Sequence, residues 1–171
     1  QICENNPTQA VEMIAELQER VEEVQTEMRL MVYELRPVNL EKKDFFAAVD
    51  DLVELYQSRY ELEVATYLQG DESEIEDKVQ LVLYRVIQEA LNNIVKHAES
   101  KKVNLKLLVD QKKIELMVKD EGKGFDPDNL EKENKHFGLE SMEERLESVS
   151  GRFQIKTESG QGTEIKAVIP R

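Results

Sequence analysis

The 171-residue sequence has few of the residues that build metal centres and disulfides. Its single cysteine, Cys3, cannot form a disulfide within the chain. The two histidines, His97 and His136, have no His or Cys neighbour at ligand spacing, which argues against a structural zinc site. No apolar run approaches the roughly 18 residues of a membrane span, and there is no signal segment. These absences predict a cytoplasmic piece of a longer protein, with no membrane insertion of its own.

The sequence also lacks the two commonest nucleotide-binding signatures. No Gly-x4-Gly-Lys-Ser/Thr phosphate loop occurs anywhere in the chain. The glycines Gly122 and Gly124 lack the third glycine and the following helix of a dinucleotide fingerprint. A P-loop fold and a Rossmann fold are therefore disfavoured.

Positive charge is scarce in the first half of the chain, and the net charge is −13. Residues 1–79 hold 20 acids and 7 bases, whereas residues 80–171 hold 16 of each. Binding to a nucleic-acid backbone or to an anionic membrane surface requires clustered Lys and Arg. We therefore expect no nucleic-acid partner and no role at a lipid surface.

The acidic first segment shows the periodicity of a bundle helix. Apolar residues from Ala10 to Leu35 follow an unbroken alternation of three and four residues, with glutamates between them. Val11, Leu30 and Val32 widen the apolar stripe beyond a two-stranded seam, which favours a multi-helix bundle. Pro37 ends the pattern. Two units are predicted: a bundle helix over residues 1–38 and a second domain over 39–171.

The sequence of the second domain predicts a mixture of helices and strands. Asn39 is a candidate cap for a helix to about Arg59, and Ser73 with Glu76 forms a capping-box pattern for a helix to about Ala98. A third helix is expected near 138–149. Strands are predicted from alternation at 62–68, 102–109, 113–119, 153–157 and 163–169. The polar stretch 126–137 reads as a loop. Strands with helices on one face make an α+β sandwich.

Two local patterns mark a candidate ligand site. Glu89 and Asn93 lie four residues apart, which places a carboxylate and an amide on one helical face. Asp120 ends a predicted strand, and Gly122 and Gly124 follow it, so that the backbone can approach a ligand closely. Each pattern alone is more often ordinary: a solvated helix face in the first case, a tight turn in the second. Their combination in one compact sequence favours a nucleotide site.

Four segments in one order carry a family resemblance. They read QEALNNIVKHA, DEGKGF, FGLESMEERLESVSGRF and SGQGTEIKAVIP. The order resembles the ATP-binding domain that histidine kinases share with gyrase and MutL proteins, and within that group it is most similar to sensor histidine kinases that work with NarL-type response regulators. The resemblance covers residues 75–170, and extends less specifically to Glu34-Leu35-Arg36-Pro37, which looks like the end of the second dimerisation helix.

The resemblance implies a fold and a set of roles. The fold would be a Bergerat-type two-layer α/β sandwich, with a mixed, mostly antiparallel sheet, preceded by a long bundle helix. The ligands would be ATP and Mg²⁺. Asn93 would coordinate the Mg²⁺, Asp120 would accept the adenine amino hydrogen, and Glu89 matches the catalytic glutamate of ATPase relatives. The remaining implied nucleotide-binding residues are Lys96, His97, Gly122, Gly124, Gly138, Leu139, Gly162 and Thr163.

The resemblance also implies partners and an incomplete phosphorylation machinery. In the parent protein, a homodimer, the γ-phosphate would pass to a histidine and then to an aspartate of a NarL-type response regulator. Many members of this subfamily are membrane-anchored. No histidine precedes His97, so the phosphoacceptor helix is not in this sequence. The fragment is expected to bind ATP without autophosphorylating, and the segment 126–137 is expected to act as the lid over ATP.

Two other interpretations remain open at this stage. An anti-sigma-factor serine kinase would share the fold, although such proteins are not expected to carry a heptad helix ending in Leu-Arg-Pro. A non-enzymatic dimerisation module would explain the heptads and reduce the glycine segments to turns. Nucleotide binding would distinguish either kinase from the dimerisation module. The type of residue phosphorylated, histidine or serine, would distinguish the two kinases.

Overall fold

The computed structural model describes residues 44–125 and 137–171. These residues all belong to one compact unit, Lys42–Arg171. The predicted bundle helix over 1–38, the cap at Asn39 and nearly all of the predicted lid lie outside the described residues. No helix among the described residues is long and apolar enough to span a membrane.

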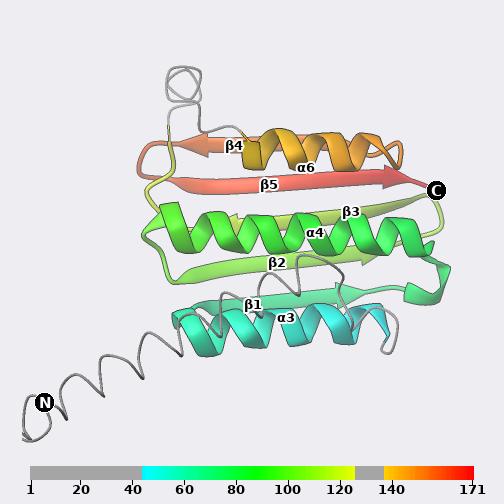
Figure 1. Ribbon diagram of the computed structural model, residues 1–171, viewed down its shortest axis with the longest axis horizontal. Coiled ribbons are helices and arrows are strands. Elements are labelled where there is room, and N and C mark those ends of the chain that lie inside the picture. Colours follow the sequence, from blue (N-terminus) through cyan, green and yellow to red (C-terminus); the bar gives the residue numbers. More distant parts are fainter. Residues whose placement is uncertain (1–43, 126–136) are drawn as a thin grey trace, which may run out of the picture. The chain divides into compact units, whose positions relative to one another are not determined.

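The described residues build a five-stranded sheet with the order β1-β2-β3-β5-β4 (Figure 1). The strands are β1 (Glu63–Gln69), β2 (Lys102–Val109), β3 (Lys113–Asp120), β4 (Arg152–Glu158) and β5 (Gly162–Pro170). β1 pairs with β2 in parallel, and the other three pairings are antiparallel. The parallel pair needs a crossover, which the helix between β1 and β2 supplies. The predicted mixed, mostly antiparallel sheet is confirmed.

Alternation within the strands divides the sheet into a buried face and an open face. In β2 and β3 the buried positions recur at every second residue. The register sets Leu105 opposite Val118, and Val118 opposite Ile165, so one apolar row crosses three strands. This row faces the helices, as the alternation predicts.

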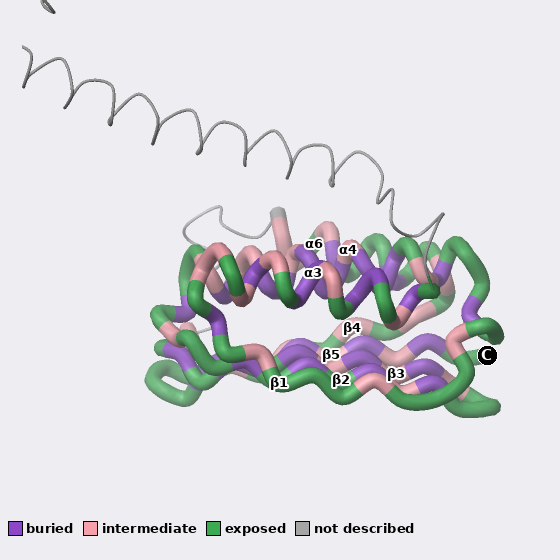
Figure 2. The backbone as a smooth tube through the Cα atoms, turned by 90° about the horizontal axis from the view of Figure 1, so that it is seen from below, coloured by how far each residue is buried: buried purple, intermediate pink, exposed green. Residues whose placement is uncertain are grey.

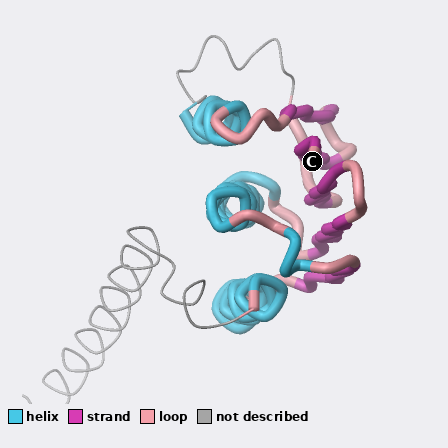
Figure 3. The backbone as a smooth tube through the Cα atoms, turned by 90° about the vertical axis from the view of Figure 1, so that its right-hand side faces the viewer, coloured by secondary structure: helices cyan, strands magenta, loops and turns pink. Residues whose placement is uncertain are grey.

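Three helices cover the buried face of the sheet: α3 (Phe45–Tyr60), α4 (Asp77–Asn93) and α6 (Phe137–Glu147). Figure 3 shows them as one layer beside the curved sheet, and Figure 2 shows the buried residues gathered between the two layers. Leu83, Leu91, Met142 and Leu146 are fully buried there. Each such side chain contributes about 1.5–3 kcal/mol by leaving water. The predicted two-layer sandwich is therefore confirmed.

The helix that bears the candidate site differs from its prediction at both ends. The predicted capping box was wrong: α4 begins at Asp77, whereas Ser73 lies in a separate turn, η1 (Glu72–Glu74), and its amide donates to Asp71. At the other end, the α-helix stops at Asn93 and continues as a π-helical segment, η2 (Ile94–Ala98). Glu99 then closes it in a left-handed conformation at φ 56°.

Candidate functional site

A cavity of about 560 Å³ lies between the helical layer and the sheet. Its walls come from α4 and η2, from the ends of β3, β4 and β5, from the segment after β3 and from the start of α6. The volume suits a small-molecule ligand. Nine of the residues predicted for the site line it: Glu89, Asn93, Lys96, His97, Asp120, Gly124, Gly138, Leu139 and Thr163.

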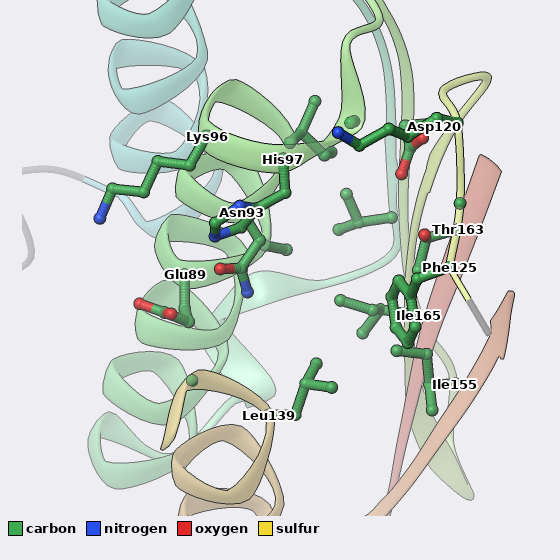
Figure 4. Close-up of a pocket in the computed structure, with 17 residues that line it drawn as sticks. Glu89, Asn93, Lys96, His97, Asp120, Phe125, Leu139, Ile155, Thr163 and Ile165 are labelled. Atoms are coloured by element: carbon green, nitrogen blue, oxygen red, sulfur yellow. The ribbon is translucent and has the colours of Figure 1, made fainter. Parts of the chain in front are cut away.

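The helical wall carries four polar or charged side chains, those of Glu89, Asn93, Lys96 and His97. Glu89 and Asn93 are one turn apart on α4, and His97 follows four residues later on η2. A π turn holds more residues than an α turn, so η2 changes the direction in which the side chains after Asn93 leave the helix. In the close-up the His97 ring lies beside the Asn93 side chain (Figure 4).

The sheet wall holds a buried carboxylate. Asp120 ends β3 and is 2% exposed, and its Oδ1 accepts a hydrogen bond from the Gly122 amide at 2.7 Å. Burial raises the pKa of this carboxyl, although hydrogen bonds from the backbone amides of Gly122 and Thr163 oppose the rise. Thr163, at the start of β5, lies near Asp120 in Figure 4. This end of the cavity therefore offers a ligand the buried Asp120 carboxylate as a hydrogen-bond acceptor, with the Thr163 hydroxyl nearby.

Close backbone approach explains two of the glycines. Gly162 has φ 78°, and a side chain there would overlap the carbonyl oxygen of Asp120, so only glycine lets β5 start against the end of β3. A side chain at Gly138 would overlap Glu89 Oε1 and lie 3.5 Å from Asn93 Nδ2. The start of α6 is therefore packed directly on the polar face of α4. Gly122 and Gly162 shape the site without lining the cavity.

Apolar side chains make up most of the remaining wall. Figure 4 shows Phe125, Ile155 and Ile165 on the strand side, with Leu139 across from them. The complete apolar lining is Ala90, Ile94, Ala98, Val118, Phe125, Leu139, Ile155 and Ile165. Sequence reasoning missed Val118, Ile155 and Ile165 as site residues, because alternation marks them only as facing inward. Their position gives Asp120 an apolar surround.

The arrangement fits a ligand with two unlike parts. A flat apolar group bearing an N–H donor would fill the space beside Ile165 and donate to Asp120. An anionic group would meet Lys96, His97 and the first amides of α6, because a helix N-terminus favours negative charge. Glu89 and Lys96 point away from the strands in Figure 4, so these two ends are well separated.

A divalent cation at this site would depend on the ligand for most of its coordination. Within 44–125 and 137–171, no group of three or more His, Cys, Asp and Glu side chains is placed to hold a metal. Asn93 supplies an amide oxygen, a suitable single ligand for Mg²⁺, which commonly takes its other ligands from phosphates and water. The residues present fit Mg²⁺ arriving with a phosphorylated ligand.

Comparison with known proteins shows the family of this chain. Residues 78–171 match the family "Histidine kinase-, DNA gyrase B-, and HSP90-like ATPase". The sensor histidine kinase LiaS of Bacillus subtilis is 32% identical over 86% of this chain and 40% of its own length. The signal transduction histidine-protein kinase/phosphatase DegS of Brevibacillus brevis is 31% identical over 95% of this chain and 42% of its own.

Solved structures agree on the fold. The Erythrobacter litoralis EL346 blue-light activated histidine kinase aligns with a TM-score of 0.61 at 18% identity, over 93% of this chain and 49% of its own. Its histidine kinase domain aligns with a TM-score of 0.54 at 16% identity, over 74% and 58%. The chain spans about two fifths of the length of the two curated relatives.

Proposed function

Because the chain belongs to the family of histidine kinase-, DNA gyrase B- and HSP90-like ATPases, we propose that it is the ATP-binding catalytic region of a sensor histidine kinase. The observation that carries the proposal is the buried carboxylate of Asp120 at the end of an apolar cavity whose opposite wall holds Asn93, Lys96 and His97. Adenine is flat and apolar, with an amino group that can donate to Asp120. The triphosphate is anionic.

Each predicted site residue has a place in this pose. Asp120 accepts the adenine amino hydrogen, and Thr163 hydrogen-bonds beside it. The amides of Gly138 and Leu139, with Lys96 and His97, bind phosphate oxygens. Asn93 contributes one oxygen to Mg²⁺, which neutralises phosphate charge when it is bound. Gly122, Gly124 and Gly162 hold the backbone close enough to complete the adenine end.

The reaction is phosphoryl transfer to a protein histidine. An imidazole nitrogen of the acceptor forms a bond to the γ-phosphorus, the bond from that phosphorus to the β–γ bridging oxygen breaks, and ADP leaves. Glu89, packed against the start of α6 at the phosphate end, is the carboxylate placed to accept the proton that the imidazole loses. The structural framework thus contributes positioning and charge, which dominate catalysis in this reaction class.

The wider assignment concerns the parent protein. We infer that residues 1–38 supply the second helix of a dimerisation and phosphotransfer domain, and that residues 39–171 form the ATP-binding domain. The parent would be a homodimer that passes its phosphate to a NarL-type response regulator. Support comes from the heptad pattern ending in Leu-Arg-Pro and from the sensor kinases that the chain resembles. Use of ATP places this region on the cytoplasmic side.

The proposal predicts that Asn93→Ala abolishes histidine phosphorylation. The full-length parent is incubated with γ-labelled ATP and Mg²⁺, and the stability of the protein-bound phosphate in acid and in base is measured. Wild type should carry label that is lost in acid and retained in base, as expected for an N–P bond, and Asn93→Ala should lose at least 90% of it, roughly the tenfold effect of 1.4 kcal/mol.

Asn104→Ala is the matched control, because Asn104 is exposed on the open face of the sheet. It should retain wild-type labelling. Acid-stable phosphate would show transfer to serine or threonine instead of histidine. Full labelling of Asn93→Ala would remove Asn93 from the site.

A further inference from the structure

A hydroxyl outside the cavity connects three parts of its wall. Thr157 lies near the end of β4, paired with Thr163 of β5. Its Oγ1 accepts a hydrogen bond from the Phe125 amide at 3.0 Å and lies 3.2 Å from Thr163 Oγ1. It also lies within donating distance of two carbonyl oxygens, Gly162 O at 3.2 Å and Phe125 O at 3.4 Å. Four polar neighbours surround one hydroxyl.

We propose that Thr157 is a positioning residue for the adenine end of the site: its hydroxyl holds Phe125 against the cavity and sets the hydrogen-bonding direction of Thr163. The proposal rests on the ATP-binding function above and deepens it. Thr157 does not itself line the cavity, whereas Phe125 and Thr163 both do. Its effect on a ligand would therefore be exerted through these two residues.

The first part of the role concerns Phe125. Residues 121–125 leave β3 and run along the β4–β5 turn, where the Gly160 amide donates to Lys123 O at 2.6 Å. That bond is between backbone groups and holds the middle of the segment. The next hydrogen bond along the segment runs from the Phe125 amide to the Thr157 hydroxyl. Because its acceptor is a side chain, a single substitution removes it. Without it, the aromatic wall of the cavity loses its nearest tie to the sheet.

The second part concerns the proton on Thr163. A threonine hydroxyl has one proton to donate and two lone pairs to accept with. When Thr157 donates to Gly162 O, it can accept from Thr163, which then presents only lone pairs to the cavity. When Thr157 donates to Thr163, the Thr163 proton is free to point at Asp120 or at the ligand. Thr157 thereby determines whether Thr163 acts as donor or acceptor beside adenine.

The opposing interpretation is that Thr157 merely stabilises the β4–β5 turn. A turn-stabilising hydroxyl would change the unfolding temperature, and would leave ligand affinity unchanged at temperatures well below unfolding. A positioning hydroxyl would change affinity at the adenine end. Loss of the Thr157 hydroxyl should lower the affinity for adenosine, ADP and ATP by the same factor, with and without Mg²⁺, because this hydroxyl does not touch the phosphate end.

The test is calorimetric titration of the 171-residue chain and its variants with adenosine, ADP and a non-hydrolysable ATP analogue. Thr157→Val keeps the β-branched shape and removes the hydroxyl, and we expect about a fivefold loss of affinity for all three, the size of one neutral hydrogen bond. Thr157→Ser keeps the hydroxyl and should bind within about twofold of wild type. Thr66→Val, on edge strand β1, is the control for a lost threonine hydroxyl in the sheet.

A double variant tests the route through Thr163. If Thr157 acts partly through that residue, Thr157→Val combined with Thr163→Val should lose less affinity than the two single losses multiplied together. Should Thr157→Val fail to fold, Thr157→Ala lacks the same hydroxyl without added bulk, and the same losses are expected. Wild-type affinity in the folded hydroxyl-free variant would overturn the proposal. Failure of the wild type to bind any of the three ligands would instead overturn the proposed function.

Discussion

At the scale of single residues, Asp120 shows a conflict between stability and binding. A carboxyl that is 2% exposed is shielded from the water that would hydrate its charged form, so burial disfavours that form and raises the pKa. The amides of Gly122 and Thr163 compensate only part of that cost. A residue chosen for stability alone would be neutral here. The proposed ligand would give this carboxylate a role, because its N–H donor needs an acceptor at this point.

The raised pKa of Asp120 gives a pH-dependent prediction. Between the ordinary aspartate pKa and the raised value, the folded chain binds more protons than the unfolded chain, so the contribution of Asp120 to stability falls as pH rises. Asp120→Asn removes this cost. Relative to wild type, the variant should gain free energy of unfolding as pH is raised through this window toward 7, measured by urea unfolding without nucleotide.

Asp110→Asn provides a control of opposite sign. Hydrogen bonds from the amides of Lys112 and Lys113 lower the pKa of Asp110, so that carboxylate stabilises the fold above its ordinary pKa. Asp110→Asn should therefore lose free energy of unfolding relative to wild type as pH rises through the acidic range. Parallel curves for the two variants would contradict the assignment of the Asp120 environment.

At the scale of elements, the site depends on where α4 ends and where β3 meets β5. His97 lies in the π-helical segment that follows Asn93, and the close contact of Gly162 with the end of β3 fixes where β5, with Thr163, begins. Both features are backbone arrangements. Substitutions that alter the backbone should therefore damage the site more than substitutions of comparable size elsewhere.

Two glycines, one in the β4–β5 turn and one at the start of β5, allow this to be measured. Gly160 and Gly162 both have φ near 80°, but a side chain at Gly160 meets no atom within 4 Å, whereas one at Gly162 would overlap Asp120 O. Gly160→Ala should cost about 1 kcal/mol of stability from its positive φ and keep nucleotide affinity. Gly162→Ala should cost more and weaken ATP binding at least tenfold, by calorimetry. Equal effects of the two substitutions would contradict the close-contact account.

The elements were largely predictable because their signals are local. The predicted strand ranges match the ends of the five observed strands to within one residue. The π segment was not predictable, because a shift in helical hydrogen bonding has no pattern in residue type. The capping-box error arose at the other end of α4: Ser73 and Glu76 have the right spacing, but Ser73 belongs to a separate turn.

The site was predictable in its polar part and much less so in its apolar part. Glu89, Asn93 and Asp120 could be identified because core packing does not account for charged and amide side chains at these positions of a helix and at a strand end. Ile155 and Ile165 look like other inward-facing strand residues, and only the spacing of the two layers decides that they line a cavity instead of solid core. Thr157 was missed for a similar reason: its neighbours Phe125 and Gly162 come together only after folding.

At the scale of the whole molecule, the two-layer sandwich accounts for the location of the cavity. The helices pack tightly on the sheet along most of its width, and the cavity opens between the layers where α4 passes into η2 and α6 begins. Binding there bridges the helices and the sheet. The family match, residues 78–171, includes every residue that lines this cavity.

In the proposed function, this cavity binds ATP through Asp120, with Mg²⁺ at the phosphate end. The most direct measurement is calorimetric titration of the chain with a non-hydrolysable ATP analogue, with and without Mg²⁺, beside Asp120→Asn. We predict wild-type binding that strengthens with Mg²⁺, and at least a tenfold loss in Asp120→Asn, equal to about 1.4 kcal/mol. Absence of binding by the folded wild-type chain, or equal binding by both forms, would contradict the account.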